Sequence, residues 1–224
     1  LSPDGEFGGV VLPPLPREVD AREYRYDQKS KRMVGLSTQV RFEAQFVHKP
    51  RSPVGEASAE WQWRLLASLA ETVALMHSVN MVHGDLSYTN VLALQKSDTH
   101  LDDHVYLIDV DEAFLDDGCE NRLTVVRKSR NTYDPYSVEA RRVSKETDVF
   151  VVALWAVAFM QHKFEAPEKI AQGVPSEATS RLSEANPSLP SVVEAALGPI
   201  GSRPVIMDLY KGIRKGAKSI GAVR

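Results

Sequence analysis

A polar segment between two apolar segments constrains the fold of this chain more than any other feature. It reads His83-Gly84-Asp85-Leu86-Ser87-Tyr88-Thr89-Asn90. From about residue 59 to 79, apolar residues recur at three- and four-residue spacing before it, which predicts an amphipathic helix. A β-type segment follows at Val91–Leu94. Asp85 and Asn90 therefore bound a loop between a helix and a strand, where both side chains can face one cleft.

A second apolar strand is predicted at Val105–Ile108, directly before Asp109. A polar turn rich in Asp, Ser and Thr separates it from Val91–Leu94, which predicts a β-hairpin. A carboxylate that follows this strand leaves the sheet facing the same cleft as the loop. His77 lies on the apolar face of the preceding helix, and we interpret it as a packed, hydrogen-bonded histidine rather than a ligand.

The remainder of the chain is predicted to be mainly helical. The longest apolar run, Val149–Met160, is far shorter than the roughly 20 residues that span a bilayer, so it predicts a buried helix. Thr147 or Asp148 is expected to cap this helix. Further helices are predicted at about 164–172, 189–197 and 204–217, with a loop rich in Ser, Pro and Ala between the first two.

Length and composition are those of an ordinary globular protein. The chain has 224 residues, of which 43% are hydrophobic and 25% are charged, and its formal net charge is −3. This balance indicates neither disorder nor a polyanion-binding surface, so we expect no nucleic-acid partner and no membrane partner. A single cysteine, Cys119, fits a reducing interior, and we expect a cytoplasmic location.

Taken in order, these motifs resemble the lower lobe of the protein-kinase-like superfamily. The loop matches the catalytic-loop pattern His-Arg-Asp-Leu-x-x-x-Asn in every position but the Arg, which is Gly84 here. The resemblance implies an α+β fold, a mainly α-helical kinase-like C-lobe with a small β-hairpin at the active site. It also implies an ATP- and Mg²⁺-dependent phosphotransferase, with Asp85 as catalytic base and Asn90 and Asp109 as metal ligands.

The resemblance also implies structural roles for residues outside the loop. Asp148, at the start of the buried helix, would brace the catalytic loop that His83 opens. Tyr133–Glu139 is similar to the end of the family's activation segment, and Arg203 resembles the late Arg that pairs with its Glu. We therefore expect an ion pair between Glu139 and Arg203.

The resemblance divides the chain at the hinge between the two kinase lobes. Residues 1–16 form the hinge and the end of the N-lobe, with Leu12 and Pro13 beside the adenine of ATP. Residues 17–224 form the C-lobe. It consists of an irregular insert at 17–58, the catalytic helix, loop and hairpin at 59–111, an activation segment at 112–147 and a helical subdomain at 148–224.

Two features depart from the family pattern. The Asp-Phe-Gly motif reads Asp109-Val110-Asp111, and we interpret Asp111 either as a further metal ligand or as a solvated carboxylate. No glycine-rich loop and no strand lysine precede the hinge, so the N-lobe is largely absent. We expect an upstream segment of the same protein to supply it, since the sequence begins with Leu1 rather than Met.

The sequence leaves the phosphoryl acceptor open. His-Gly-Asp also opens the catalytic loop of aminoglycoside and choline phosphotransferases, and the Asp85-Leu86-Ser87 run is similar to that of RIO-type kinases. The long stretch from Asp109 to Asp148, together with Glu139 within it and Arg203 after it, favours a protein Ser/Thr kinase-like domain that acts on a protein substrate. The alternatives are a small-molecule kinase and a catalytically weak pseudokinase or interaction module.

Overall fold

The computed structural model describes residues 24–27, 32–35, 39–41, 51–52, 55–56, 59–86, 90–97, 100–107, 110, 113–116, 132–161 and 165–223. The strands are β1 (Tyr24–Asp27), β2 (Arg32–Gly35), β3 (Gln39–Arg41), β4 (Arg51–Ser52), β5 (Gly55–Glu56), β6 (Met81–Val82), β7 (Val91–Ser97), β8 (His100–Leu107) and β9 (Phe114–Leu115). The helices are α2 (Ala59–Ser78), α3 (Pro135–Ala140), α4 (Lys145–Gln161), α5 (Pro167–Gln172), α6 (Ser176–Ala185), α7 (Leu189–Ala196) and α8 (Ile206–Ser219). This mixture confirms the predicted α+β class.

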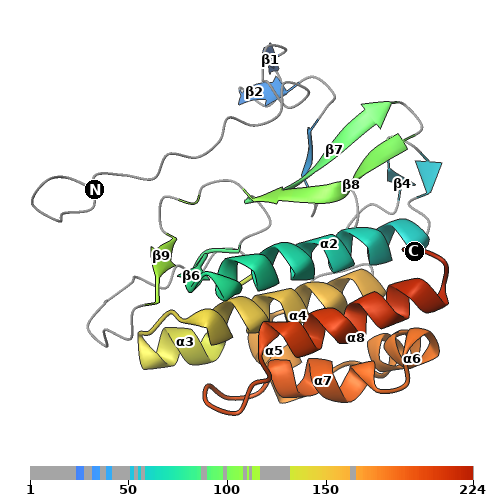
Figure 1. Ribbon diagram of the computed structural model, residues 1–224. Coiled ribbons are helices and arrows are strands. Elements are labelled where there is room, and N and C mark those ends of the chain that lie inside the picture. Colours follow the sequence, from blue (N-terminus) through green and yellow to red (C-terminus); the bar gives the residue numbers. More distant parts are fainter. Residues whose placement is uncertain are drawn as a thin grey trace, which may run out of the picture.

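Helix α2 separates a small sheet from the other helices (Figure 1). One face of α2 contacts β8, and other faces contact α4 and α8. The predicted helix over about 59 to 79 is confirmed, because Leu66, Leu69 and Val73 are fully buried at helical spacing. The sheet has the antiparallel order β3-β7-β8. The predicted hairpin is also confirmed, although its strands continue further toward the turn than the apolar positions indicate.

Helix α4 is the centre of the helical layer. Every residue from Thr147 to Gln161 is buried, because α2, α6, α7 and α8 pack around this helix. The predicted cap is wrong for Asp148, since the helix begins at Lys145 and Asp148 lies inside its first turn. Thr147 takes part in capping from the third helical position, where its Oγ1 accepts the Ser144 N–H at 3.0 Å.

Two further predictions differ from the structure. The segment 17–58 was predicted to be irregular, yet β1 to β5 fall within it; strands of two to four residues are too short to show an alternating pattern. A loop was predicted before α7, where the structure has α6. Only Ala178, Leu182 and Ala185 of α6 are buried, so its apolar face is small and is masked by serines.

Candidate active site

The candidate catalytic loop, residues 83–90, connects strands β6 and β7. Strand β6 leads into it and pairs antiparallel with β9, with Val82 opposite Phe114. Strand β7 leads out of it at Val91, which is fully buried, and Asn90 directly precedes this strand. Both ends of the loop are thus anchored in the core, since Val82 and Val91 are fully buried.

Asp148 holds the start of the loop through its backbone. Its Oδ2 accepts the His83 N–H at 2.9 Å, and its Oδ1 accepts the Gly84 N–H at 3.0 Å. The same Oδ2 lies 3.0 Å from Nε2 of His77 on α2. Asp148 is 1% exposed, so these partners satisfy a carboxylate that water does not reach. This is the bracing contact that the kinase resemblance implies.

Asp85 and Asn90 are in direct contact. The Asn90 Nδ2 donates to the Asp85 backbone oxygen at 2.9 Å and to Asp85 Oδ2 at 3.2 Å. Asn90 is 3% exposed, whereas Asp85 is partly exposed. The buried amide therefore orients a carboxylate that can meet a ligand, which is the geometry that a general base requires.

Gly84 explains the departure from the His-Arg-Asp pattern. Its φ is +79°, a left-handed conformation that favours glycine. A Cβ atom at this position would lie 3.1 Å from Cγ1 of Val143, which is buried. Backbone conformation and packing together therefore disfavour an arginine here.

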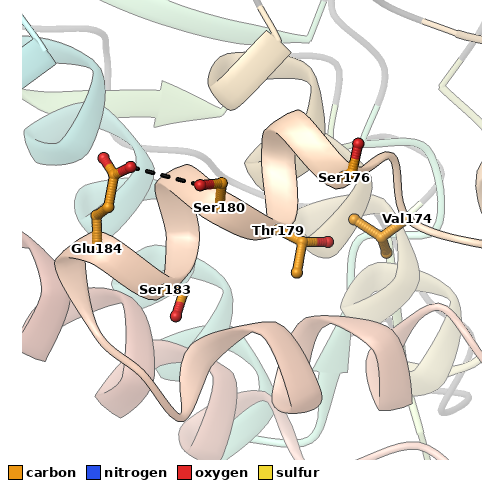
Figure 2. A pocket seen from close by; sticks show the side chains of 6 residues that line it. All are labelled: Val174, Ser176, Thr179, Ser180, Ser183 and Glu184. Carbon is orange, nitrogen blue, oxygen red and sulfur yellow. Dashed lines mark hydrogen bonds between the residues drawn. The ribbon is translucent and has the colours of Figure 1, made fainter.

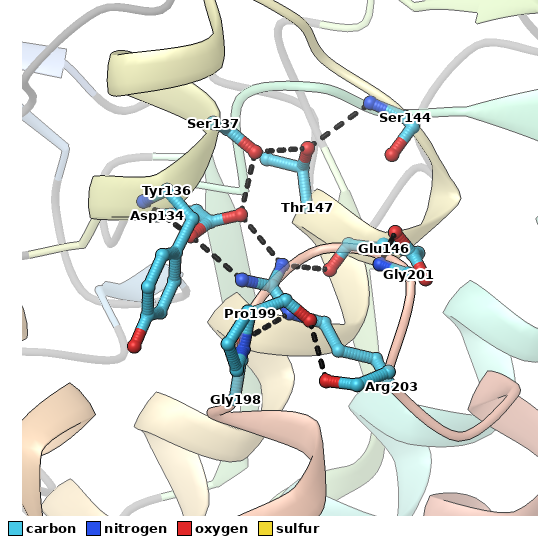
Figure 3. Close-up of polar contacts among 11 residues, drawn as sticks. Asp134, Tyr136, Ser137, Ser144, Glu146, Thr147, Gly198, Pro199, Gly201 and Arg203 are labelled. Atoms are coloured by element: carbon cyan, nitrogen blue, oxygen red, sulfur yellow. Dashed lines mark hydrogen bonds and ion pairs between the residues drawn. The ribbon is translucent and has the colours of Figure 1, made fainter.

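A second buried carboxylate, Asp134, pairs with Arg203 (Figure 3). The Arg203 Nη1 donates to Asp134 Oδ2 at 2.6 Å, and Nη2 donates to Oδ1 at 3.0 Å. Arg203 also donates to the backbone oxygens of Gly198 at 2.7 Å and Glu146 at 2.8 Å. Its guanidinium carbon lies 4.9 Å from the centre of the Phe150 ring. The pair thus connects the start of α3, the start of α4 and the segment before α8.

The predicted ion pair between Glu139 and Arg203 is wrong. Glu139 is exposed at the end of α3, whereas Asp134 is the N-cap residue of that helix and is 0% exposed. Asp134 also accepts the Tyr136 N–H at 3.0 Å and the Ser137 hydroxyl at 2.5 Å. A buried guanidinium requires a buried carboxylate, and Asp134 supplies it.

The structure brings four of the predicted site residues together: His83, Asp85, Asn90 and Asp148. Leu12, Pro13 and Asp109, predicted for ATP and metal, lie outside the described residues, as does Asp111. The interpretation of His77 as a packed, hydrogen-bonded histidine is confirmed, since it is 8% exposed and contacts Asp148. Sequence reasoning missed Asp134, for which the available signal was an Asp followed by a proline, a helix-start pattern.

The donor atoms at the loop suit a hard cation. Carboxylate and amide oxygens are the ligands that Mg²⁺ prefers, and Asp85 and Asn90 carry them. The described residues contain no group of three or more His, Cys, Asp and Glu side chains that could hold a metal ion. Asn90 thus fits the metal in its chemistry, and Asp109 lies outside the described residues.

A hollow of about 660 Å³ on α6 is separate from this site (Figure 2). Its lining comes from α6 and the residues just before it, and it includes the hydroxyls of Ser176, Thr179, Ser180 and Ser183. Helix α6 packs against α4, α7 and α8, and no residue of the catalytic loop lines the hollow. It therefore takes no part in the candidate chemistry.

The braced loop with its Asp–Asn pair is the arrangement of a kinase-like phosphotransferase. Residues 48–131 match the model of the lipopolysaccharide kinase (Kdo/WaaP) family. The matched region contains α2, the catalytic loop and the hairpin, and it is less than half of the chain. This match confirms the resemblance to the protein-kinase-like superfamily and supports a kinase-like phosphotransferase. No curated protein matches the chain. In the described part of the chain, no helix is long and apolar enough to cross a membrane.

Proposed function

We propose that this protein transfers the γ-phosphoryl group of ATP to a hydroxyl group of a saccharide, with Mg²⁺ as cofactor. The observation that carries the proposal is the contact between Asn90 and Asp85, on a loop whose start is held by Asp148. A positioned carboxylate is the protein group that phosphoryl transfer to a hydroxyl needs. In this proposal the described helices form the C-lobe of a kinase, and an upstream segment supplies the N-lobe.

The mechanism assigns a task to each residue of the loop. Asp85 accepts a hydrogen bond from the acceptor hydroxyl and takes its proton as the hydroxyl oxygen forms a bond to the γ-phosphorus and ADP leaves. Asn90 keeps the Asp85 carboxylate aligned, and Asp148 keeps the loop in place. Asn90 and Asp109 would hold Mg²⁺, which supplies positive charge to the phosphates. Leu12 and Pro13 would contact the adenine ring.

Two observations favour a saccharide over a protein as acceptor. The matching family is named for lipopolysaccharide, and its model covers the catalytic loop itself. In addition, the ion pair between Glu139 and Arg203, which was one reason to expect a protein Ser/Thr kinase, is replaced by the pair between Asp134 and Arg203. A protein acceptor and an inactive pseudokinase become outcomes of the test.

The test follows the radiolabel of [γ-³²P]ATP, in the presence of Mg²⁺, into three acceptors offered to the full-length protein. These are lipopolysaccharide core oligosaccharide, free monosaccharides and a generic protein such as casein. We expect label in a saccharide, and Asp85→Asn should lower the rate by about 10²-fold or more. The matched control is Glu194→Gln, which neutralises an exposed carboxylate on α7 and should leave the rate unchanged.

Each outcome decides between the proposals. Label in the protein alone would replace the saccharide kinase with a protein kinase. An unchanged rate in Asp85→Asn would remove Asp85 from the mechanism. No binding of ATP by the folded protein would support the pseudokinase or interaction module.

A further inference from the structure

A cavity of about 310 Å³ lies between the last turns of α2, the first turn of α4 and the residues that lead into α8. Ala74, Val149, Ile206 and Met207 give it an apolar wall. His77 and Lys145 lie among its polar lining residues. Cavities that are mainly apolar with a few polar groups are typical sites for small ligands.

Two of the apolar residues that line this cavity are exposed to solvent. Among the exposed large hydrophobic side chains of the described residues, Val205 is 65% exposed and Met207 is 40% exposed, and both line the cavity. Exposed apolar side chains that gather at one place indicate a binding surface rather than chance.

Among the charged residues that line the cavity, Lys145 is the cation that can attract an anionic ligand. Its Nζ donates to the Asn80 Oδ1 at 2.7 Å, and this amide is neutral. Arg203 pairs with Asp134, and His77 contacts Asp148. Glu146 keeps its negative charge, but both of its carboxylate oxygens accept the Gly201 N–H, at 3.1 and 2.9 Å, and Gly201 does not line the cavity. An anionic head group would therefore complement Lys145.

We propose that this cavity binds a linear aliphatic monocarboxylate, with its chain along the apolar wall and its carboxylate on Lys145. A cavity of about 150 Å³ holds one benzene molecule, so twice that volume suits a ligand of roughly ten to twelve carbon atoms. The site is distinct from the catalytic loop, and no residue of that loop lines it.

The His77 side chain connects the cavity with the loop. His77 lines the cavity and contacts Asp148, which holds the His83 and Gly84 amides. A ligand packed against His77 restrains it in the position that supports Asp148. Bound ligand should therefore stabilise the braced loop, which couples the two sites.

The test titrates sodium decanoate, below its micellar concentration, into the full-length protein and measures heat and hydrogen exchange. We expect saturable binding and slower exchange of the His83 and Gly84 amides. Ser78→Trp, at an exposed lining position, should obstruct the cavity and weaken binding by about tenfold or more. Lys145→Gln should weaken it by about three- to tenfold.

Two controls separate the contribution of the ligand's charge from that of its aliphatic chain. Lys211→Gln removes an exposed cation from α8 that does not line the cavity and should leave binding unchanged. Decanol, which has no charge, should bind wild type and Lys145→Gln equally. Absence of decanoate binding to the folded protein, or equal binding to Ser78→Trp, would overturn the site. Binding without slower loop exchange would overturn the coupling. Neither result depends on phosphotransfer, so the site and the kinase proposal fail independently.

Discussion

Two buried aspartates, one at the N-cap of α3 and one in the first turn of α4, differ in what they hold. Asp148 is 1% exposed and accepts two backbone N–H groups of the catalytic loop, whereas Asp134 is 0% exposed and faces a guanidinium in a two-point ion pair. Asp148 therefore fixes the position of a loop, and Asp134 fixes how α3, α4 and the segment before α8 fit together. The same residue type thus holds the candidate catalytic loop in one place and joins helices in the other.

Replacing Asp148 should give the largest effect on activity. Asp148→Ala leaves the His83 and Gly84 N–H groups without their acceptor, which costs about 2–5 kcal/mol of unfolding free energy and releases the loop. We expect phosphotransfer per folded molecule to fall by about 10²-fold or more. Initial rates and urea denaturation measure the two effects separately.

Asp148→Asn is the control, because it keeps the shape and one acceptor oxygen. Its activity should lie between wild type and Asp148→Ala. A folded Asp148→Ala protein with wild-type turnover would show that the loop needs no brace.

Replacing Arg203 should lower the stability of the protein but leave the turnover of each folded molecule nearly unchanged. Arg203→Met leaves the Asp134 carboxylate buried without its cation, which should lower the unfolding free energy by about 3–5 kcal/mol. Turnover per folded molecule should change little, since Arg203 does not contact the catalytic loop in the described structure. Urea denaturation and rates normalised to the folded fraction test both statements.

A double variant sharpens this prediction. Asp134→Asn with Arg203→Met removes both charges and should be less destabilised than the sum of the two single variants. Additive losses would mean that the two side chains do not act as a pair.

Gly84 allows a smaller and more local test of the Asp148 region. Gly84→Ala adds a Cβ at φ +79° that lies 3.1 Å from Val143 Cγ1, whereas Gly201→Ala adds one at φ +88° with nothing within 4 Å. The two glycines share the backbone cost of roughly 1 kcal/mol, so any larger loss in Gly84→Ala reports the contact with Val143. Denaturation midpoints of both variants test this prediction. The midpoint of Gly84→Ala in the Val143→Ala background shows whether removing the Val143 side chain relieves the loss. Equal losses in both glycine variants would remove the packing argument.

The contact between Asp85 and Asn90 was predictable from sequence because the two residues lie close together in the chain. Asp85 and Asn90 are five positions apart, and the helix before them and the strand after them have clear apolar patterns. The bracing role of Asp148 was implied by the kinase resemblance and agrees with the structure. The particular backbone N–H groups that it accepts leave no trace in side-chain identity, so the residue pattern alone does not reveal them.

The partner of Arg203 was not predictable in the same way. Asp134 and Glu139 are both acidic and five positions apart, and family resemblance pointed to Glu139. The choice depends on burial, since Asp134 lies under the segment before α8 while Glu139 faces solvent. Helix α6 was missed for a related reason, because two of its three buried residues are alanines, which give a weak apolar pattern.

Tyr133, next to Asp134, should show the smallest effect. Its hydroxyl donates to Glu168 on α5, and burial, followed by this hydrogen bond and the Glu168 charge, raises the tyrosine pKa to about 12. A pKa raised above the usual 10.0 stabilises the fold fully below pH 10, and this stabilisation is lost as pH rises through 12. Tyr133→Phe should cost about 0.5–1 kcal/mol, since the contact is near the surface. The loss should be constant between pH 7 and about pH 10, as measured by urea denaturation at several pH values.

Tyr136→Phe, in the same segment, is the control and should be neutral, because its described contacts with Phe150 and Arg203 involve the ring. A loss in Tyr133→Phe as large as that in Arg203→Met would show that the contact between Tyr133 and Glu168, rather than the buried ion pair, holds this part of the molecule.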